Sequence, residues 1–387
     1  DDDASAECGA ARVLAECRLE RARAEVPGTL ASGMQVGADA SVVFVVADGS
    51  SCARAAAFVE ALLDDTRSID DDLLARVIAR TALAADDAES LYPGLALQSR
   101  ARLALCSGSA ARSTAGSARA IQALAPARAR ELLRVAVPRR GWGLGLLPEA
   151  LRASLAMALT GPVAIPQNSR TAAAQAIAAP EFVPHARVDS PFVAAAFLVP
   201  SSEQLPAFAI GVEVARARAW RRFRAMGREA MARAPFVSWS WLAGDPLVTF
   251  CRRGFDPRKL WPGEQAAADA EAERIAVQAE LQGLLEDLRR VPPSAQELAS
   301  AVRCLEVELA VAPASAGNAV TAGESALLPG RIQARLLAAQ RGIDVAALAA
   351  VQASELHDVL RSTLAAERAW WGGLMPYPLP GVGWSSR

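Results

Sequence analysis

The sequence has few side chains that could form a metal site rich in histidine. Its 387 residues include only two histidines, His185 and His357, which lie far apart along the chain. Zinc sites in enzymes and zinc fingers need three or four nitrogen or sulfur ligands close together. The six cysteines never occur as a C-x-x-C pair, which excludes a zinc ribbon and a thioredoxin-like redox site. A multi-histidine metal centre is therefore not expected.

Long hydrophobic runs and strong net charge are also missing. No run of about 18 uninterrupted apolar residues occurs, so no transmembrane helix is expected. The formal net charge of −1 gives no general attraction to nucleic acid or to an anionic membrane. The sequence contains no P-loop and no G-x-S-x-G elbow, which leaves out the common phosphate-binding and serine-hydrolase motifs.

The sequence has enough apolar residues to form a folded core. Hydrophobic residues make up 52% of the chain, which excludes a disordered protein. At roughly 100–200 residues per domain, the length predicts two domains or two halves. The basic residues are nearly all arginine, with Lys259 as the single lysine, and this bias indicates a GC-rich coding sequence rather than a chemistry.

Hydrophobic periodicity predicts helices and strands in alternating groups. The expected helices are 9–24, 54–64, one that opens near 68, 117–134 with a kink at Pro126, 202–232, 264–290, one from Ser294, 326–341 and 352–366. The expected strands are 41–47, 141–147, 192–199, 236–241, 247–251 and 369–375. The helix from Ser294 begins with a capping box that Glu297 completes. Residues 160–190 carry four prolines and are read as a linker.

Two stretches of the chain resemble each other. A helix ending in Leu132-Leu133-Arg134 is followed by Trp142 and an apolar run to Pro148. A helix ending in Val359-Leu360-Arg361 is followed by Trp370 and an apolar run to Pro376. A repeat of this length indicates duplicated units, and grouped strands and helices favour an α+β fold. We predict two duplicated halves, each an antiparallel sheet with helices packed on one face, arranged as a clamshell.

The predicted boundaries are 1–160 for the first half, 161–190 for the linker and 191–387 for the second half. Projected backwards, the repeat implies that the first half starts late and lacks one early strand, which could be processed, truncated or supplied by another chain. No signal peptide is recognisable at Asp1-Asp2-Asp3-Ala4. The compartment stays open, with an extracytoplasmic or periplasmic location favoured over a cytoplasmic one.

Several motifs in this order resemble the inverzincin metallopeptidases, the pitrilysin and mitochondrial-processing-peptidase family. The segment 9–16 (GAARVLAE) lies where that family has its G-x-x-H-x-x-E-H helix, and 33–46 is similar to the edge-like strand region that follows. Gly116-Ser117 with Ile121 and Leu124 resembles a family helix entry, and 293–301 resembles its "t-x-x-E-L-x-x-A" helix. The similarity covers nearly the whole chain.

The resemblance implies a zinc site that this sequence has lost. The two family histidines fall on Arg12 and Glu16, with Ala15 in place of the glutamate, or on Val13 and Cys17 in a register shifted by one. Glu89 lies in the region of the family's downstream ligand. Two neutral imidazoles and a carboxylate base are needed for this chemistry, so we expect no catalytic zinc and no other cofactor in this chain.

Family members without the metal site often act as partners of an active subunit, whose chain would then hold the zinc. In such pairs the second half can offer an Arg and a Tyr to the substrate backbone. Arg228 matches the Arg, whereas Pro235 or Phe236, depending on register, replaces the Tyr. Phe can pack against a peptide but cannot donate a hydrogen bond. The expected substrate-binding residues are therefore Arg228 and Phe236.

The resemblance thus implies a non-catalytic subunit of a heteromeric zinc-peptidase-like complex that helps to enclose and position a peptide. It would form a heterodimer with a homologous active subunit, in a bacterial peptide-processing system, without nucleic acid and without a membrane span. The alternative is a structural pseudopeptidase in a larger assembly, such as an envelope or respiratory complex. A stand-alone enzyme with another mechanism is the third hypothesis.

Two further features have ordinary explanations. Seven arginines lie within 216–233, beside Trp220 and Phe223. They could bind an acidic peptide, a partner or RNA, but a solvated or interface helix face is the favoured interpretation. The six cysteines could form disulfides in an oxidising compartment, although most are expected to be small buried hydrophobes. His357 is expected to face solvent.

Overall fold

The structure is a computed structural model of the full chain. It describes residues 9–28, 31–36, 41–46, 50–64, 69–106, 118–135, 149, 153, 180–185, 188, 190–225, 227, 235–239, 246–254, 265–309 and 343–376. The predicted strand 141–147 and the predicted helix 326–341 lie outside these residues, as do Cys8, Lys259 and Arg228. The statements that follow refer to the described part of the chain.

The first part of the chain contains one strand pair and a group of helices. These elements are α2 (Ala10–Glu25), β1 (Ala31–Val36), β2 (Ser41–Val46), α3 (Cys52–Leu63), α4 (Asp71–Leu91), α5 (Pro93–Leu105), α6 (Ala118–Gln122) and α7 (Pro126–Val135). Strands β1 and β2 pair in the antiparallel direction, with Gly33 opposite Phe44. A Cβ at Gly33 would lie 2.7 Å from the Phe44 ring, so the glycine makes room for that ring.

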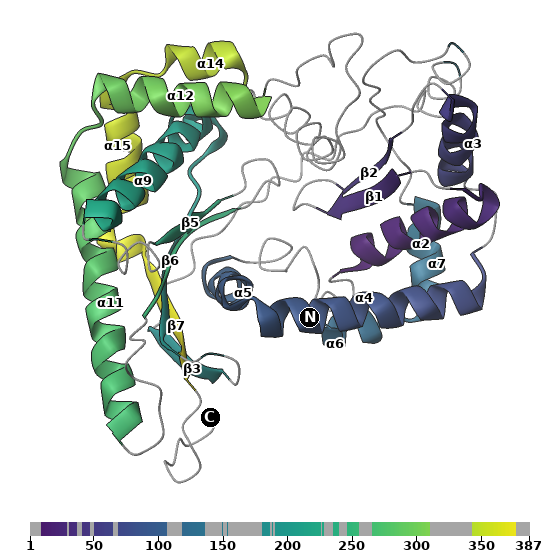
Figure 1. Ribbon diagram of the computed structural model, residues 1–387, viewed down its shortest axis with the longest axis horizontal. Helices are drawn as coiled ribbons and strands as arrows, with labels where there is room; N and C mark the ends of the chain where they lie inside the picture. The colour runs from purple at the N-terminus through teal and green to yellow at the C-terminus, as the bar shows by residue number, and fades with distance from the viewer. Residues whose placement is uncertain are drawn as a thin grey trace.

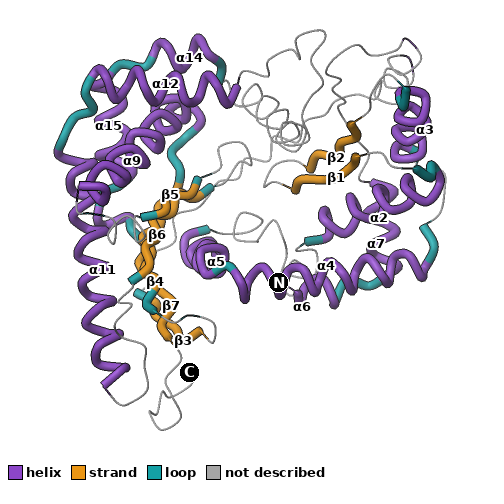
Figure 2. Tube along the Cα trace, in the orientation of Figure 1, coloured by secondary structure: helices purple, strands orange, loops and turns teal. Residues whose placement is uncertain are grey.

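The second part of the chain forms a larger sheet with its own helices. Its elements are β3 (Glu181–His185), β4 (Phe192–Leu198), the 3₁₀ turn η2 (Ser202–Gln204), α9 (Leu205–Ala225), β5 (Phe236–Ser238), β6 (Leu247–Arg253), α11 (Gln265–Arg290), α12 (Ala295–Leu309), α14 (Val345–Ala350), α15 (Ala353–Thr363), the 3₁₀ turn η4 (Ala366–Arg368) and β7 (Trp370–Pro376). Figure 1 shows these elements beside those of the first part, and Figure 2 shows the two separate groups of strands.

The five strands of this sheet have the order β3-β7-β4-β6-β5. All neighbours are antiparallel except β3 and β7, which are parallel, so the sheet is mixed rather than purely antiparallel as predicted. Strand β3 falls within the segment 161–190 that was interpreted as a linker. Its pairing with β7, the last strand of the chain, places part of that segment in the fold itself.

Helices cover both faces of the five-stranded sheet. Helices α9, α11 and α15 lie on one face, and α5 from the first part of the chain lies on the other (Figure 1). Leu97, Ala101 and Leu105 of α5 are buried against residues of β4, β6 and β7. The prediction placed helices on one face only. The α+β fold with helix-covered sheets is confirmed, and the structure adds this second helical layer.

Contacts along α5 fix its position on the sheet. Gln98 donates a hydrogen bond to Ser238 of β5, at one edge of the sheet. Arg100 pairs with Glu181 of β3, at the opposite edge. Since residues two apart in a helix point to nearly opposite sides, α5 runs over the middle strands and reaches both edges. Strand β4 has the sequence FVAAAFL, and the small alanines at its centre allow this close approach.

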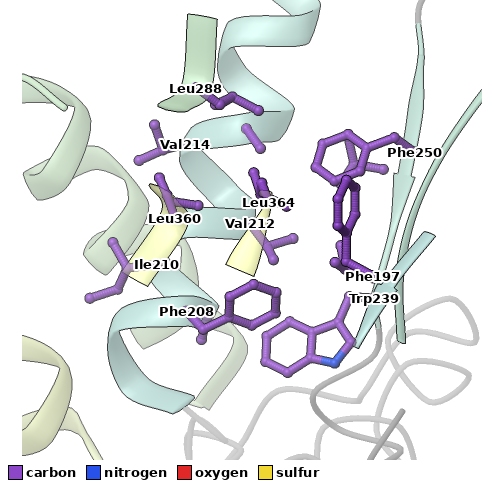
Figure 3. Close-up of a cluster of buried hydrophobic side chains, with 14 of the residues drawn as sticks. Phe197, Phe208, Ile210, Val212, Val214, Trp239, Phe250, Leu288, Leu360 and Leu364 are labelled. Atoms are coloured by element: carbon purple, nitrogen blue, oxygen red, sulfur yellow. The ribbon is translucent and has the colours of Figure 1, made fainter. Parts of the chain in front are cut away.

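The main core lies between the sheet and α9. Phe197 of β4 and Phe250 of β6 meet edge to face with ring centroids 6.1 Å apart, and Phe208 of α9 meets Trp239 at 4.9 Å. Figure 3 shows these rings beside aliphatic residues of α9, α11 and α15. Aromatic pairs in this geometry contribute about 0.5–1.5 kcal/mol beyond the apolar area that they bury. This cluster therefore holds α9 against the sheet.

The duplicated organisation is visible in two short helix pairs. Helices α6 and α7 begin at Ala118 and Pro126, and helices α14 and α15 begin at Val345 and Ala353. Both starts are 227 positions apart (345 minus 118, and 353 minus 126). In the second pair, β7 follows as predicted. The predicted helix 117–134 is thus two helices, because Pro126 has no N–H group and starts a new one.

A second helix also ends earlier than predicted. The expected helix 202–232 is a 3₁₀ turn followed by α9, which ends at Ala225. Gly227 has a φ of 105°, in the left-handed region that glycine adopts without strain and that ends many helices. The stretch from 228 to 234 lies outside the described residues.

A buried ion pair joins α9 to the start of α12. Arg218 is 8% exposed and binds both oxygens of Glu297 at 3.1 Å, and it also donates to the Val291 carbonyl at 2.8 Å. The predicted capping box is confirmed, because the Ser294 N–H donates to Glu297 at 2.9 Å and the Glu297 N–H donates to the Ser294 hydroxyl at 3.2 Å. Glu297 therefore binds two elements at once.

We expect Gly211→Val to destabilise the protein by about 1–3 kcal/mol through overpacking. A Cβ at this position of α9 would lie 2.7 Å from Leu360 Cδ2 and 3.2 Å from Leu356 Cδ1, both on α15. Urea unfolding measures the change. The control is Gly94→Ala on α5, where a Cβ meets nothing within 4 Å and the stability should stay the same or rise slightly. Equal stability of Gly211→Val and wild type would contradict the packing described here.

A second prediction concerns the pH dependence of the Glu297 contacts. Burial alone would raise the pKa of this carboxyl, but hydrogen bonds from Arg218, the Ser294 backbone and Arg221 outweigh burial and lower the pKa from 4.5 to about 2. A lowered folded-state pKa stabilises the protein above pH 4.5, and this contribution is lost as the pH falls toward 2.

Replacing Glu297 with Gln should therefore cost about 2 kcal/mol at neutral pH, and less as the pH falls below 4.5. The measurement is the free energy of unfolding of both proteins between pH 7 and the acid transition. The matched control is Glu355→Gln in the first turn of α15, an exposed carboxylate whose replacement should cost less than that of Glu297 at neutral pH. A constant cost at every pH would show that Glu297 acts through packing rather than charge.

Candidate functional site

Helix α2 carries the positions that correspond to a zinc-binding helix. It begins after Gly9, whose φ of 89° only glycine adopts easily, and it packs between α3 and α4. Arg12 and Glu16 are half-buried on this helix, one turn apart. Ala15, which lies between them in sequence, is buried at 7% exposure. The structure therefore places Arg12 and Glu16 together on one accessible side of α2.

The alternative register falls on an adjacent side of the helix, which is buried. Val13 and Cys17 are both fully buried, in a cluster with Leu74 and Val77 of α4. Burial, together with a smaller contribution from the nearby Glu16 carboxylate, raises the pKa of the Cys17 thiol to about 12. A thiol that stays protonated is a poor metal ligand, because the thiolate is the form that binds. Cys17 is thus a small hydrophobic core residue.

An arginine occupies the space beside the Glu16 carboxylate. Arg80 of α4 lies 3.1 Å from Glu16 and 3.6 Å from Glu20, one turn further along α2. One guanidinium thus bridges two carboxylates at the surface between α2 and α4. Two carboxylates this close can attract a divalent cation, but here the compensating charge is the chain's own. Arg80 was not predicted, because nothing in a single sequence pairs a residue of α4 with one of α2.

The third position of the expected metal site is less defined. Glu89 lies on α4, near its C-terminal end, and its side chain is outside the described residues. Within the described ranges, no group of three or more His, Cys, Asp or Glu side chains is arranged to hold a metal ion. At the position predicted for the lost zinc site, the structure therefore has the charged cluster of Glu16, Glu20 and Arg80.

The two predicted substrate-binding residues have different outcomes. Arg228 lies outside the described residues, so its position stays a prediction. Phe236 is the first residue of β5 and is 67% exposed. It pairs with Cys251 and shares a sheet face with Ser238, the residue that Gln98 of α5 contacts. A large exposed aromatic ring therefore lies at the sheet edge, on the face that α5 covers.

The arginine-rich stretch is only partly a solvated helix face. Three of its members bind the protein itself: Arg218 and Arg221 contact Glu297, and Arg216 contacts the backbone of β5. Arg222 and Arg224 are exposed in the last turn of α9, where positive charge is favourable next to the helix C-terminus. The interpretation as a solvated or interface helix face therefore needs correction for Arg216, Arg218 and Arg221, because these three arginines join α9 to neighbouring elements of the same chain.

The structure also tests the predictions for the histidines and cysteines. The ring of His357 is half-buried, and its Nε2 lies 2.8 Å from the Arg289 carbonyl, so the expectation that it faces solvent is wrong. His185 ends strand β3. Of the five described cysteines, Cys17, Cys106 and Cys251 are buried, and burial raises the pKa of Cys251 to about 12. Most described cysteines thus behave as buried hydrophobes.

Among the described helices, none is both long enough and apolar enough to cross a membrane.

Comparisons by sequence give no relatives: no family model matches the chain, and a search of curated proteins also finds no match.

Comparisons of structure give many matches. A protease from Helicobacter pylori is 13% identical with a TM-score of 0.69, over 96% of this chain and 90% of that one. A chain of complex III2 from Candida albicans is 9% identical with a TM-score of 0.62, over 96% and 87%. An inactive domain of peptidase M16 from Pseudomonas fluorescens is 13% identical with a TM-score of 0.55, over 94% and 85%. The predicted resemblance is thus confirmed at the level of structure: the chain has the fold of the M16-like peptidases.

Proposed function

We propose that this chain is a non-catalytic subunit of a heteromeric zinc-peptidase-like complex, in which it helps to enclose and position a peptide. A homologous subunit with an intact H-x-x-E-H helix would hold the zinc and cleave the peptide. The fold is one shared by a protease and by an inactive M16 domain, which supports a role beside a peptidase.

The observation that carries the proposal is the chemistry of α2. Where the resemblance expects two histidines and a glutamate, the accessible side of the helix has Arg12 and Glu16, with a buried Ala15 between them. The Glu16 carboxylate pairs with Arg80. A guanidinium repels a dication and cannot act as a ligand, because it carries five donors and no acceptor. Side chains that bind each other at this position support a loss of metal chemistry.

The second part of the proposal concerns the peptide. Phe236 is exposed at the edge of the sheet, where its ring can pack against a passing chain but cannot form a hydrogen bond. Arg228 would supply the hydrogen-bond donors that Phe236 lacks. Together Arg228 and Phe236 would hold a peptide without reacting with it. This chain would then bind the substrate, and the partner subunit would cleave it.

A second candidate function is a scaffold in a larger assembly. The likeness to a chain of complex III2, at a TM-score of 0.62, supports this alternative, because this fold then also occurs in a multi-subunit assembly. The two candidates differ in their neighbours. An adjacent gene for an intact H-x-x-E-H homologue favours the peptidase subunit, whereas a position among unrelated assembly genes favours the scaffold.

The central experiment is co-purification with such a homologue, followed by a peptide-cleavage assay of each chain alone and of the pair. We expect the pair to cleave faster than the partner alone, this chain alone to be inactive, and a chelator to abolish the activity of the pair. Metal analysis should find zinc in the partner. Chelator-sensitive cleavage by this chain alone would overturn the proposal, and a stable complex without any effect on cleavage would favour the scaffold.

Arg228→Ala tests the role in binding peptide. We expect the variant to pair normally with the active subunit but to lower kcat/KM by about 10- to 100-fold, since a charge-assisted hydrogen bond contributes roughly 1.5–3 kcal/mol. The control is Arg361→Ala on α15, an exposed residue paired with Asp358, which should leave kcat/KM unchanged. If both variants have the kinetics of the wild-type pair, Arg228 does not contact the substrate.

A further inference from the structure

Two helices of the protein carry the same short motif, and the next strand after each helix lies at the end of its sheet. Helix α2 has Glu20-Arg21-Ala22-Arg23 before strand β1, and helix α9 has Glu213-Val214-Ala215-Arg216 before strand β5. Both are E-x-A-R sequences. In each helix the glutamate and the final arginine are three residues apart, which places them on neighbouring positions of the helix surface.

The first motif holds the backbone of β1. Arg23 pairs with Glu20 at 2.9 Å, within α2. Its Nη2 donates to the carbonyl of Ser32 at 2.8 Å, and its Nε donates to the Ser32 hydroxyl at 3.1 Å. Ser32 is the second residue of β1, and among the described residues β1 pairs only with β2.

The second motif holds the backbone of β5 in the same way. Arg216 pairs with Glu213, within α9. Its Nε donates to the Val237 carbonyl at 3.1 Å, and its Nη2 donates to the Trp239 carbonyl at 3.2 Å. Val237 is the second residue of β5, as Ser32 is of β1. The two halves therefore repeat a glutamate-anchored arginine bound to the second residue of a strand.

These carbonyls lie at the free edge of the sheet. Strand β5 is the last in the order β3-β7-β4-β6-β5, so one of its sides has no neighbour in the described structure. In an antiparallel pair, alternate residues direct their carbonyl and N–H groups outward, away from the partner strand. Carbonyls two residues apart, as in Val237 and Trp239, point to the same side. A single guanidinium that binds both must approach from the edge opposite β6.

The contact is not a general property of such helical pairs. Glu271 with Arg274 and Glu286 with Arg289 have the same spacing on α11. Arg274 binds Gln278 of its own helix, and neither arginine donates to a strand carbonyl within the described ranges. The strand contact is thus not a consequence of the glutamate–arginine spacing alone.

We propose that the two E-x-A-R motifs close the outer edges of β1 and β5, so that an extended peptide cannot pair with either strand. An unpaired strand edge is a template for strand addition, because its outward carbonyls and N–H groups match those of another chain. Arg216 occupies two outward carbonyls beside β5 and Arg23 occupies one carbonyl of β1, each with charge-assisted hydrogen bonds that an incoming N–H would have to displace. The inference does not depend on the proposed function, since it concerns the isolated chain.

The test uses variants that remove the donors and keep the apolar stem, Arg23→Met, Arg216→Met and both together. The probe is a fluorescein-labelled heptapeptide of alternating Thr and Val with a lysine at each end, followed by fluorescence anisotropy. We expect no saturable binding to the wild-type chain. Each single variant should bind the probe saturably, with a Kd at least about tenfold below the highest concentration at which the wild-type chain shows no binding, as expected for one or two backbone hydrogen bonds regained.

Three controls make the result decisive. Arg361→Met breaks an acid–arginine pair of the same spacing on α15 and should not bind the probe. A probe methylated on alternate backbone nitrogens should not bind the Met variants. Far-UV circular dichroism reports whether each variant folds. If Arg216→Met does not fold, Arg216→Lys replaces it. The lysine reaches one carbonyl at a time, so we expect an affinity for the probe between those of the wild type and a fully open edge. Folded Arg23 and Arg216 variants that bind no better than wild type, or a methylated probe that binds equally well, would overturn the proposal.

Discussion

The burial of the five-stranded sheet on both faces is the constraint on which the rest of the structure depends. Strand β4, FVAAAFL, has a buried centre that faces α9 on one side and α5 on the other. Because α5 belongs to the first part of the chain and the sheet to the second, the second part does not cover its sheet alone. Strand β3 extends the same sheet by pairing with β7. The packing of α5 on the sheet therefore joins the two parts of the chain.

Much of this fold could be predicted from the sequence, and the exceptions have physical reasons. The periodicity of α2, α11 and α15 and the apolar runs of β2, β4 and β6 are local signals, and they predict the right elements. The capping box at Ser294 and Glu297 is equally local. Helix α5 was not among the predicted elements, and its position on the sheet is not a local signal, because a helix with one apolar stripe gives no indication of which sheet it covers. Strand β3 was missed since its sequence, EFVPH, contains a proline, which edge strands tolerate.

The candidate site shows the same division. Sequence alone identified Arg12 and Glu16 as the positions where metal ligands are missing, but two registers remained open. Burial separates them, because Val13 and Cys17 face the core while Arg12 and Glu16 do not. The ion pair of Glu16 with Arg80 joins residues 64 positions apart and could not be seen in advance. The proposed closure of β1 and β5 follows the same pattern. Carboxylates of α2 and strand carbonyls are both bound by arginines of the same chain.

The position of α5 also has a consequence for how the protein is made. Its apolar stripe, with Leu97 and Ala101, packs against Trp370, which is fully buried in β7 near the end of the described chain. During synthesis the helix leaves the ribosome long before its partner strand exists, because about 265 residues separate them at an elongation rate of roughly 5–20 residues per second. The stripe therefore stays uncovered for at least ten seconds or so. A nascent chain with such a late-arriving partner is exposed to aggregation and suited to binding by a holding chaperone.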